Sequence, residues 1–155
     1  MKLMDLLNSI FSSNMSRANL LVRFMIGWVF WSEGVQKFIY SDTLGVGRFI
    51  KIGIPFPEIT APFVGVVEIS CGLLVVIGLF TRLAAIPLVI NMIVAITTTK
   101  IPILIKNGFW SMSHEGRTDL CMILGSVFLL MVGAGQWSID SLIAGKIQRR
   151  TSALS

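Results

Sequence analysis

The sequence contains few residues that could hold a metal ion or a haem, with one histidine and two cysteines among 155 residues. Structural zinc and iron–sulfur sites need several Cys or His ligands, and haem bound between helices commonly needs paired histidines. We therefore predict no metal site and no covalently bound cofactor. Cys71 and Cys121 lie in separate apolar runs and form no Cys-x-x-Cys pair. They are expected to behave as small hydrophobic side chains rather than as a disulfide.

Charge is also scarce, since only 14% of the residues are charged and 54% are apolar. A soluble domain needs roughly a quarter of its residues charged to cover its surface, and here the apolar residues come in long runs. The composition therefore predicts an integral membrane protein. The net charge of +5 comes from Lys and Arg scattered between these runs. Nucleic-acid binding is not expected, because it requires a concentrated basic face.

Four apolar runs are each about 20 residues long, enough to cross a hydrocarbon core of about 30 Å. They predict an all-α fold, an integral membrane four-helix bundle over residues 17–143. The spans are expected at about residues 18–40, 59–80, 83–99 and 119–135. Residues 1–16 place apolar side chains at helical spacing, which predicts an amphipathic helix in the membrane interface. Residues 144–155 form a basic C-terminal tail.

The connections between the spans differ in length. Residues 41–58 and 100–118 join spans on one side of the membrane, and we expect both to be loops, the first lying on the bilayer surface. On the other side, a short turn at Thr81 and Arg82 makes the second and third spans antiparallel neighbours. Four spans place both termini on one side. The basic tail and Arg82 favour the cytoplasm for the termini, although the basic residues divide almost evenly between the two sides.

Polar side chains inside the predicted spans share one depth. At ~1.5 Å per residue, Glu33 lies ~10 Å and Glu68 ~13 Å from the side of the long connections, and Asn91 and Ser126 lie ~10–12 Å from it. An ionisable side chain in hydrocarbon is costly unless it faces a partner or water. We therefore predict a polar pocket that opens toward the long connections, above an apolar half of the bundle.

The expected roles of these residues follow from their spacing. Glu33 and Lys37 lie four residues apart on one helix face, and Lys37 could pair with Glu33 or with Glu68. A purely structural role, as an ion pair near the headgroups or a clamp between helices, is the alternative. His114 and Glu115 are candidates for a proton relay at the mouth, although a solvated histidine is the simpler interpretation. The predicted ligand-binding residues are Glu33, Lys37, Glu68 and Asn91.

An ordered set of short motifs covers about residues 20–143. The motifs are RFMIG (23–27), EGVQKF (33–38), IGIPFP (52–57), VEISCGLLVVIGLFTR (67–82) and GAGQWSID (133–140). In this order they resemble the DoxX family, which implies a four-helix bundle in the bacterial inner (plasma) membrane. The matching positions are Lys37, Glu68, Gly72, Gly78, Arg82 and Asp140. Residues 133–135 read Gly-Ala-Gly where the family has Gly-Pro-Gly. Some members are subunits of quinone-reducing sulfur oxidoreductases or belong to redox-stress complexes, and most have no assigned activity.

The leading functional hypothesis is a small membrane subunit or anchor of a quinone-linked redox complex. The polar pocket would hold a quinone-like or other lipid-soluble ligand. Electrons would come from a redox protein partner, so any activity would be that of a non-catalytic or quinone-docking subunit of an oxidoreductase. Membrane lipids are also expected partners. A second copy of the chain is the alternative to the redox protein. The alternatives are a small-solute or lipid carrier, for which we find no broken helices or inverted repeat, and a structural membrane scaffold.

Overall fold

The structure, a computed structural model, describes residues 18–152. These residues are mostly helical, and no strand occurs among them. The amphipathic helix expected over residues 1–16 lies outside the described residues. The helices are α2 (Asn19–Ile39), α3 (Val46–Ile52), α4 (Pro57–Ile77), α5 (Thr81–Ala95), a π-helical turn η1 (Ile96–Lys100), α6 (Ile101–Val132) and α7 (Ile139–Ser152).

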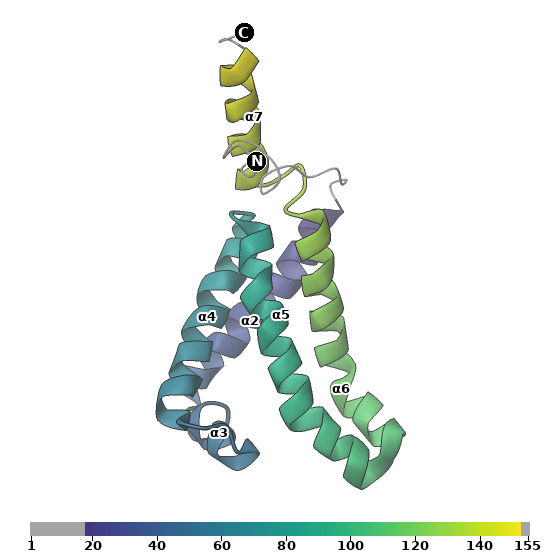
Figure 1. Cartoon of the computed structure of the whole chain (residues 1–155). Coiled ribbons are helices and arrows are strands. Elements are labelled where there is room, and N and C mark those ends of the chain that lie inside the picture. The colour runs from purple at the N-terminus through teal and green to yellow at the C-terminus, as the bar shows by residue number, and fades with distance from the viewer. Residues whose placement is uncertain (1–17, 153–155) are drawn as a thin grey trace.

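Four long helices, α2, α4, α5 and α6, form the bundle (Figure 1). The short helix α3 and the turn within α6 lie at one end of it, while α7 lies at the other end. The helix α7 extends away from the bundle, so the basic tail expected after residue 143 is helical as far as Ser152. The predicted all-α membrane fold is confirmed.

Among residues 18–152, two helical stretches are long and apolar enough, by length and composition, to cross a membrane. They are Pro57–Ile77 and Thr81–Val132, and the second reverses direction within its length, so it supplies two limbs of the bundle. The helix α2 has 21 residues but contains Arg23, Glu33 and Lys37. Arg23 and Lys37 have partners inside the bundle that offset the cost of these charges, as described below.

The first long connection contains the helix α3 (Val46–Ile52) instead of being a loop throughout, and the second is not a loop at all, so both predictions were wrong in this respect. The helix α5 continues through η1 into the first residues of α6. Gly108, with φ 82° and ψ 175°, then interrupts the helical backbone and the rest of α6 returns along the bundle. Pro102 does not stop the helix; it follows the π-helical turn η1, where the α-helical hydrogen-bond pattern is already interrupted. The polar residues that suggested a loop instead lie on exposed faces of the two limbs.

The turn between α4 and α5 lies three residues earlier than expected. Gly78, with φ 72°, ends α4 and Phe80 precedes the first residue of α5, Thr81. Asp140, at the start of α7, is buried and accepts hydrogen bonds from the backbone N–H of Phe80 (2.7 Å) and of Thr81 (3.1 Å). Its carboxylate, from a distant part of the chain, thus caps the N-terminus of α5. A negative charge is favourable at a helix N-terminus.

Glycines let α2 and α4 approach each other closely. A Cβ atom added to Gly72 of α4 would lie 2.7 Å from the carbonyl oxygen of Gly27 of α2 and 2.8 Å from the backbone nitrogen of Trp31. Gly65 and Gly34 form a similar contact one level away along the same two helices, since a Cβ on Gly34 would lie 2.7 Å from the carbonyl oxygen of Gly65. Such small-residue contacts are typical of membrane helices, whose association depends on close packing.

Replacing Gly72 with alanine should lower the free energy of unfolding by about 1–3 kcal/mol, because the methyl group would push the α2 and α4 backbones apart. Thermal unfolding of the detergent-solubilised protein would measure the change. Gly145→Ala is the matched control, since nothing lies within 4 Å of a Cβ at that position of α7. Equal unfolding temperatures for the two variants would contradict the close-packing interpretation.

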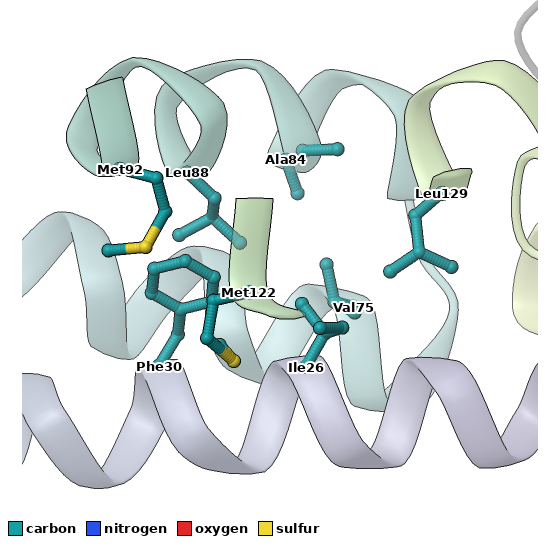
Figure 2. Close-up of a cluster of buried hydrophobic side chains, with 9 residues drawn as sticks. Ile26, Phe30, Val75, Ala84, Leu88, Met92, Met122 and Leu129 are labelled. Atoms are coloured by element: carbon teal, nitrogen blue, oxygen red, sulfur yellow. The ribbon is translucent and has the colours of Figure 1, made fainter. Parts of the chain in front are cut away.

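The apolar core lies where the four long helices meet. Figure 2 shows Ile26 and Phe30 from α2 directed toward Leu88 of α5 and Met122 of α6. Leu88 is fully buried and Phe30 nearly so. The complete cluster is Ile26, Phe30, Val75, Ala84, Ala85, Leu88, Met92, Met122 and Leu129.

Arg23 joins α4 to the α6–α7 connection at the end of the bundle where α7 lies. Its side chain is buried at 2% exposure. The Nε group donates to the carbonyl oxygen of Val75 at 3.0 Å, and Nη2 donates to that of Val76 at 2.7 Å. The Nη1 group donates to the carbonyl oxygens of Ala134 at 3.0 Å and Trp137 at 2.6 Å. A cation here also complements the negative end of the α4 dipole.

Candidate functional site

A cavity of about 500 Å³ lies at the opposite end of the bundle from Arg23, between α2, α3, α4, α5, η1 and α6. Phe30, Met92 and Met122 of the apolar core also line this cavity, so the core forms its floor. Other apolar residues of the lining are Val29, Leu44, Phe49, Ile52, Ile54, Phe63, Val64, Val94 and Ala95. The polar residues are Glu33, Lys37, Arg48, Thr60, Glu68, Asn91, Thr98, Thr99, Lys100, Glu115, Thr118 and Asp119.

Glu68 holds three helices together at the inner end of this cavity. It is buried at 3% exposure on α4. Lys37 Nζ, from α2, lies 2.5 Å from Glu68 Oε2, and Asn91 Nδ2, from α5, donates to Glu68 Oε1 at 2.5 Å. Each carboxylate oxygen therefore has a partner from a different helix. We call Lys37, Glu68 and Asn91 the polar triad.

The polar triad retains hydrogen-bonding capacity on its two outer members. The Lys37 ammonium has three N–H groups, and the structure records one hydrogen bond from it. Asn91 uses one N–H and no oxygen in the recorded bonds. Both residues line the cavity. A ligand headgroup there could accept a bond from Lys37 and donate one to the Asn91 carbonyl oxygen.

Of the two partners predicted as possible for Lys37, the structure pairs it with Glu68 and not with Glu33. Glu33 is exposed, lines the cavity, and has no hydrogen bond or salt bridge recorded with any other residue between 18 and 152. All four predicted ligand-binding residues therefore line one cavity. They divide into the polar triad, of which Glu68 alone is buried, and the carboxylate of Glu33.

Ser126 shares the predicted depth but does not belong to this site. It is fully buried on α6, it is absent from the cavity lining, and its hydroxyl donates to the Met122 carbonyl oxygen at 2.8 Å.

The two candidates for a proton relay differ in their position relative to the cavity. Glu115 lines the cavity, whereas His114 is exposed and lines neither this cavity nor the second one described below.

The π-helical turn supplies the outer part of the cavity. Thr98, Thr99 and Lys100 all line it, and Lys100 Nζ lies 3.1 Å from Asp119 Oδ2 of α6. The threonine hydroxyls donate to backbone carbonyls of the preceding turn, including Thr99 to Ala95 at 2.6 Å. Their oxygen atoms can still accept hydrogen bonds. π-Helical turns are rare and are frequent at functional sites.

Sequence reasoning missed Arg48 and Lys100 as lining residues, because both were placed in loops. Lys100 directly follows three consecutive threonines in the sequence, and this polar run was the available signal for it. Arg48 had none, since its position depends on the fold of α3 against α4 and α5. Across residues 18–152, no three His, Cys, Asp or Glu side chains gather closely enough to hold a metal ion.

Comparison with known proteins gives one family and two relatives. The DoxX family model matches residues 18–101, just over half of the chain. The membrane protein Rv3486 of Mycobacterium tuberculosis, described as uncharacterized, is 53% identical over 125 residues, covering 77% of each chain. CatD of Bacillus subtilis, named as a provisional oxidoreductase, is 28% identical over 135 residues, covering 86% of this chain and 93% of the relative. No solved structure matches the chain at a significant level.

Proposed function

This chain belongs to the DoxX family, and from that premise we propose that it is a small membrane subunit of a quinone-linked redox complex. The cavity above the polar triad binds the head of a quinone or a similar lipid-soluble molecule. The protein resides in the bacterial inner membrane with its termini in the cytoplasm. In this orientation the cavity opens toward the opposite face of the membrane.

The observation that carries this proposal is a cavity with an apolar floor and the polar triad converging at its inner end. Pockets for small ligands place a few polar groups against apolar side chains in this way, and about 500 Å³ lies within their usual range of volumes. A quinone carbonyl accepts hydrogen bonds, and Lys37 has N–H groups left to donate. The ring packs against Phe30, Met92 and Met122 on the cavity floor. An isoprenoid tail leaves toward the lipid between the helices.

The redox part of the proposal is supported by the likeness to CatD, whose name places it provisionally among the oxidoreductases. A quinone accepts two electrons and two protons when it becomes a quinol. A redox protein partner supplies the electrons. Glu33, which lines the cavity and has no recorded hydrogen bond or salt bridge with another residue between 18 and 152, would pass protons to the reduced head.

Binding of decylubiquinone to the protein in nanodiscs tests the proposal by titration calorimetry. Glu68→Gln should weaken binding about tenfold, because it removes the charge that orients Lys37 and loosens a charge-assisted hydrogen bond. Ala95→Phe should weaken binding by a similar factor, since it fills part of the cavity without removing any hydrogen-bonding group of the triad. Glu58→Gln is the matched control, because Glu58 is exposed in the first turn of α4 and lines neither described cavity.

Two results would contradict the proposal. A scaffold role predicts that Glu68→Gln lowers the unfolding temperature while the dissociation constant stays unchanged. A carrier role predicts flux of a solute or lipid across proteoliposomes that Ala95→Phe abolishes, without saturable quinone binding.

A further inference from the structure

A second cavity of about 690 Å³ adjoins the mouth of the first. The two share residues from α3, η1 and α6, including Arg48, Thr99 and Glu115. Its apolar lining consists of Ile52, Pro102 and Ile103 beside Gly47. Unlike the first cavity, it contains no member of the polar triad.

This second cavity lies at the level of the lipid headgroups. From Thr81, at the start of α5, to Lys100, at the end of η1, the helix rises by roughly 30 Å, the thickness of the hydrocarbon core. The first residue of α5, Thr81, lies at the end of the bundle where α7 begins, so Lys100 marks the opposite boundary of the hydrocarbon. Thr98, Thr99 and Lys100 all line the second cavity, which places it beside the headgroup layer.

Charges of both signs line the cavity without partners. Arg48 and Lys51 lie three residues apart on α3, while Asp42 precedes α3 and Glu115 belongs to α6. None of these four side chains has a recorded salt bridge or hydrogen bond with another residue between 18 and 152. Lys100 differs, because its ammonium already pairs with Asp119. The cavity therefore offers two free cations and two free carboxylates.

We propose that the second cavity binds the zwitterionic headgroup of a phospholipid that carries a primary ammonium, as phosphatidylethanolamine does. Arg48 and Lys51 bind the phosphate, since guanidinium and ammonium groups donate to phosphate oxygens. Asp42 and Glu115 bind the ammonium, and the hydroxyl oxygens of Thr98 and Thr99 can accept further bonds from it. This inference is independent of the quinone proposal.

The lining also discriminates between headgroups. Quaternary ammonium groups are recognised by aromatic cages, and the second cavity has no Phe, Tyr or Trp in its lining. A choline head also lacks N–H groups to donate to Asp42 and Glu115. An anionic phosphoglycerol head satisfies Arg48 and Lys51 but leaves both carboxylates without a cation. A phosphoethanolamine head satisfies all four side chains.

Native mass spectrometry tests this by measuring which lipid stays bound when the full chain is released from nanodiscs of equal phosphatidylethanolamine, phosphatidylcholine and phosphatidylglycerol. We expect one retained phosphatidylethanolamine, favoured about tenfold over each of the other two lipids. The double variant Asp42→Asn/Glu115→Gln should lose this preference in favour of phosphatidylglycerol. The double variant Arg48→Gln/Lys51→Gln should lose the retained lipid altogether.

The control is Lys106→Gln/Arg117→Gln, which removes two exposed charges near the same end of the bundle but outside both cavities. It should retain the lipid as the unchanged chain does. Unfolding temperatures confirm that each variant is folded. Free phosphoethanolamine should displace the lipid about tenfold more effectively than inorganic phosphate. Equal displacement by the two, equal retention of the three lipids, or a preference for phosphatidylglycerol in the unchanged chain would each overturn the proposal.

Discussion

Replacing Arg23 with methionine should cost at least about 3–5 kcal/mol of stability and remove most folded protein from the membrane. The guanidinium donates to four backbone carbonyls, two at the end of α4 and two in the α6–α7 connection. A methionine fills similar space but donates no hydrogen bond. Each buried carbonyl left without a donor costs about 1–3 kcal/mol, and the bundle also loses the link between two elements.

The variant Arg23→Lys separates the contribution of the four hydrogen bonds from that of the positive charge. A lysine keeps the positive charge, but its single nitrogen cannot reach carbonyls on both sides as the planar guanidinium does. We expect a stability between those of the unchanged chain and Arg23→Met, measured by SDS titration in mixed micelles. Arg117→Met is the control, since Arg117 is exposed on α6. A loss below about 1 kcal/mol for Arg23→Met would show that the four bonds contribute little net stability.

Removing either charge of the Lys37–Glu68 pair should destabilise the bundle by about 2–4 kcal/mol, whereas removing both should cost much less than the sum. Lys37→Met leaves Glu68 buried without its cation, and Glu68→Leu leaves Lys37 without its anion. The double variant leaves neither charge in the membrane interior. The coupling between the two positions should reach about 2 kcal/mol in a double-mutant cycle of unfolding free energies.

The pair formed by Lys100 and Asp119 provides the comparison for this cycle. Its atoms are further apart, at 3.1 Å against 2.5 Å, and Asp119 is more exposed than Glu68. We expect a coupling of about 1 kcal/mol or less for Lys100→Met and Asp119→Leu, because water screens part of the interaction. Additive losses at Lys37 and Glu68 would mean that the pair does not hold α2 to α4. The polar triad would then serve ligand binding and not the stability of the bundle.

Much of the fold followed from the sequence because hydrocarbon imposes strict rules on a chain. Backbone polar groups cannot find water there, so long apolar runs must be helical. The limits of α2 and α4 agree with the predicted spans within a few residues at each end. The error over residues 100–118 arose because the polar side chains there were taken as evidence for a loop. Helices that extend beyond the hydrocarbon have the same composition.

The candidate site was predictable only in part. Rise per residue gave the depth of Glu33, Glu68 and Asn91, and all three line one cavity. Depth does not give the direction in which a side chain points around the helix axis. Ser126 had the right depth but turns into its own helix, bonding the Met122 carbonyl.

By itself the sequence determined that the protein lies in a membrane, that it is helical, and at what depth its polar residues lie. These properties depend on composition and on distance along the chain. Only the tertiary structure decided that Lys37 pairs with Glu68 rather than Glu33, and that Arg23 binds carbonyls from two distant segments. Those choices depend on the rotation and packing of helices against one another. They are settled by which arrangement leaves the fewest buried polar groups without partners.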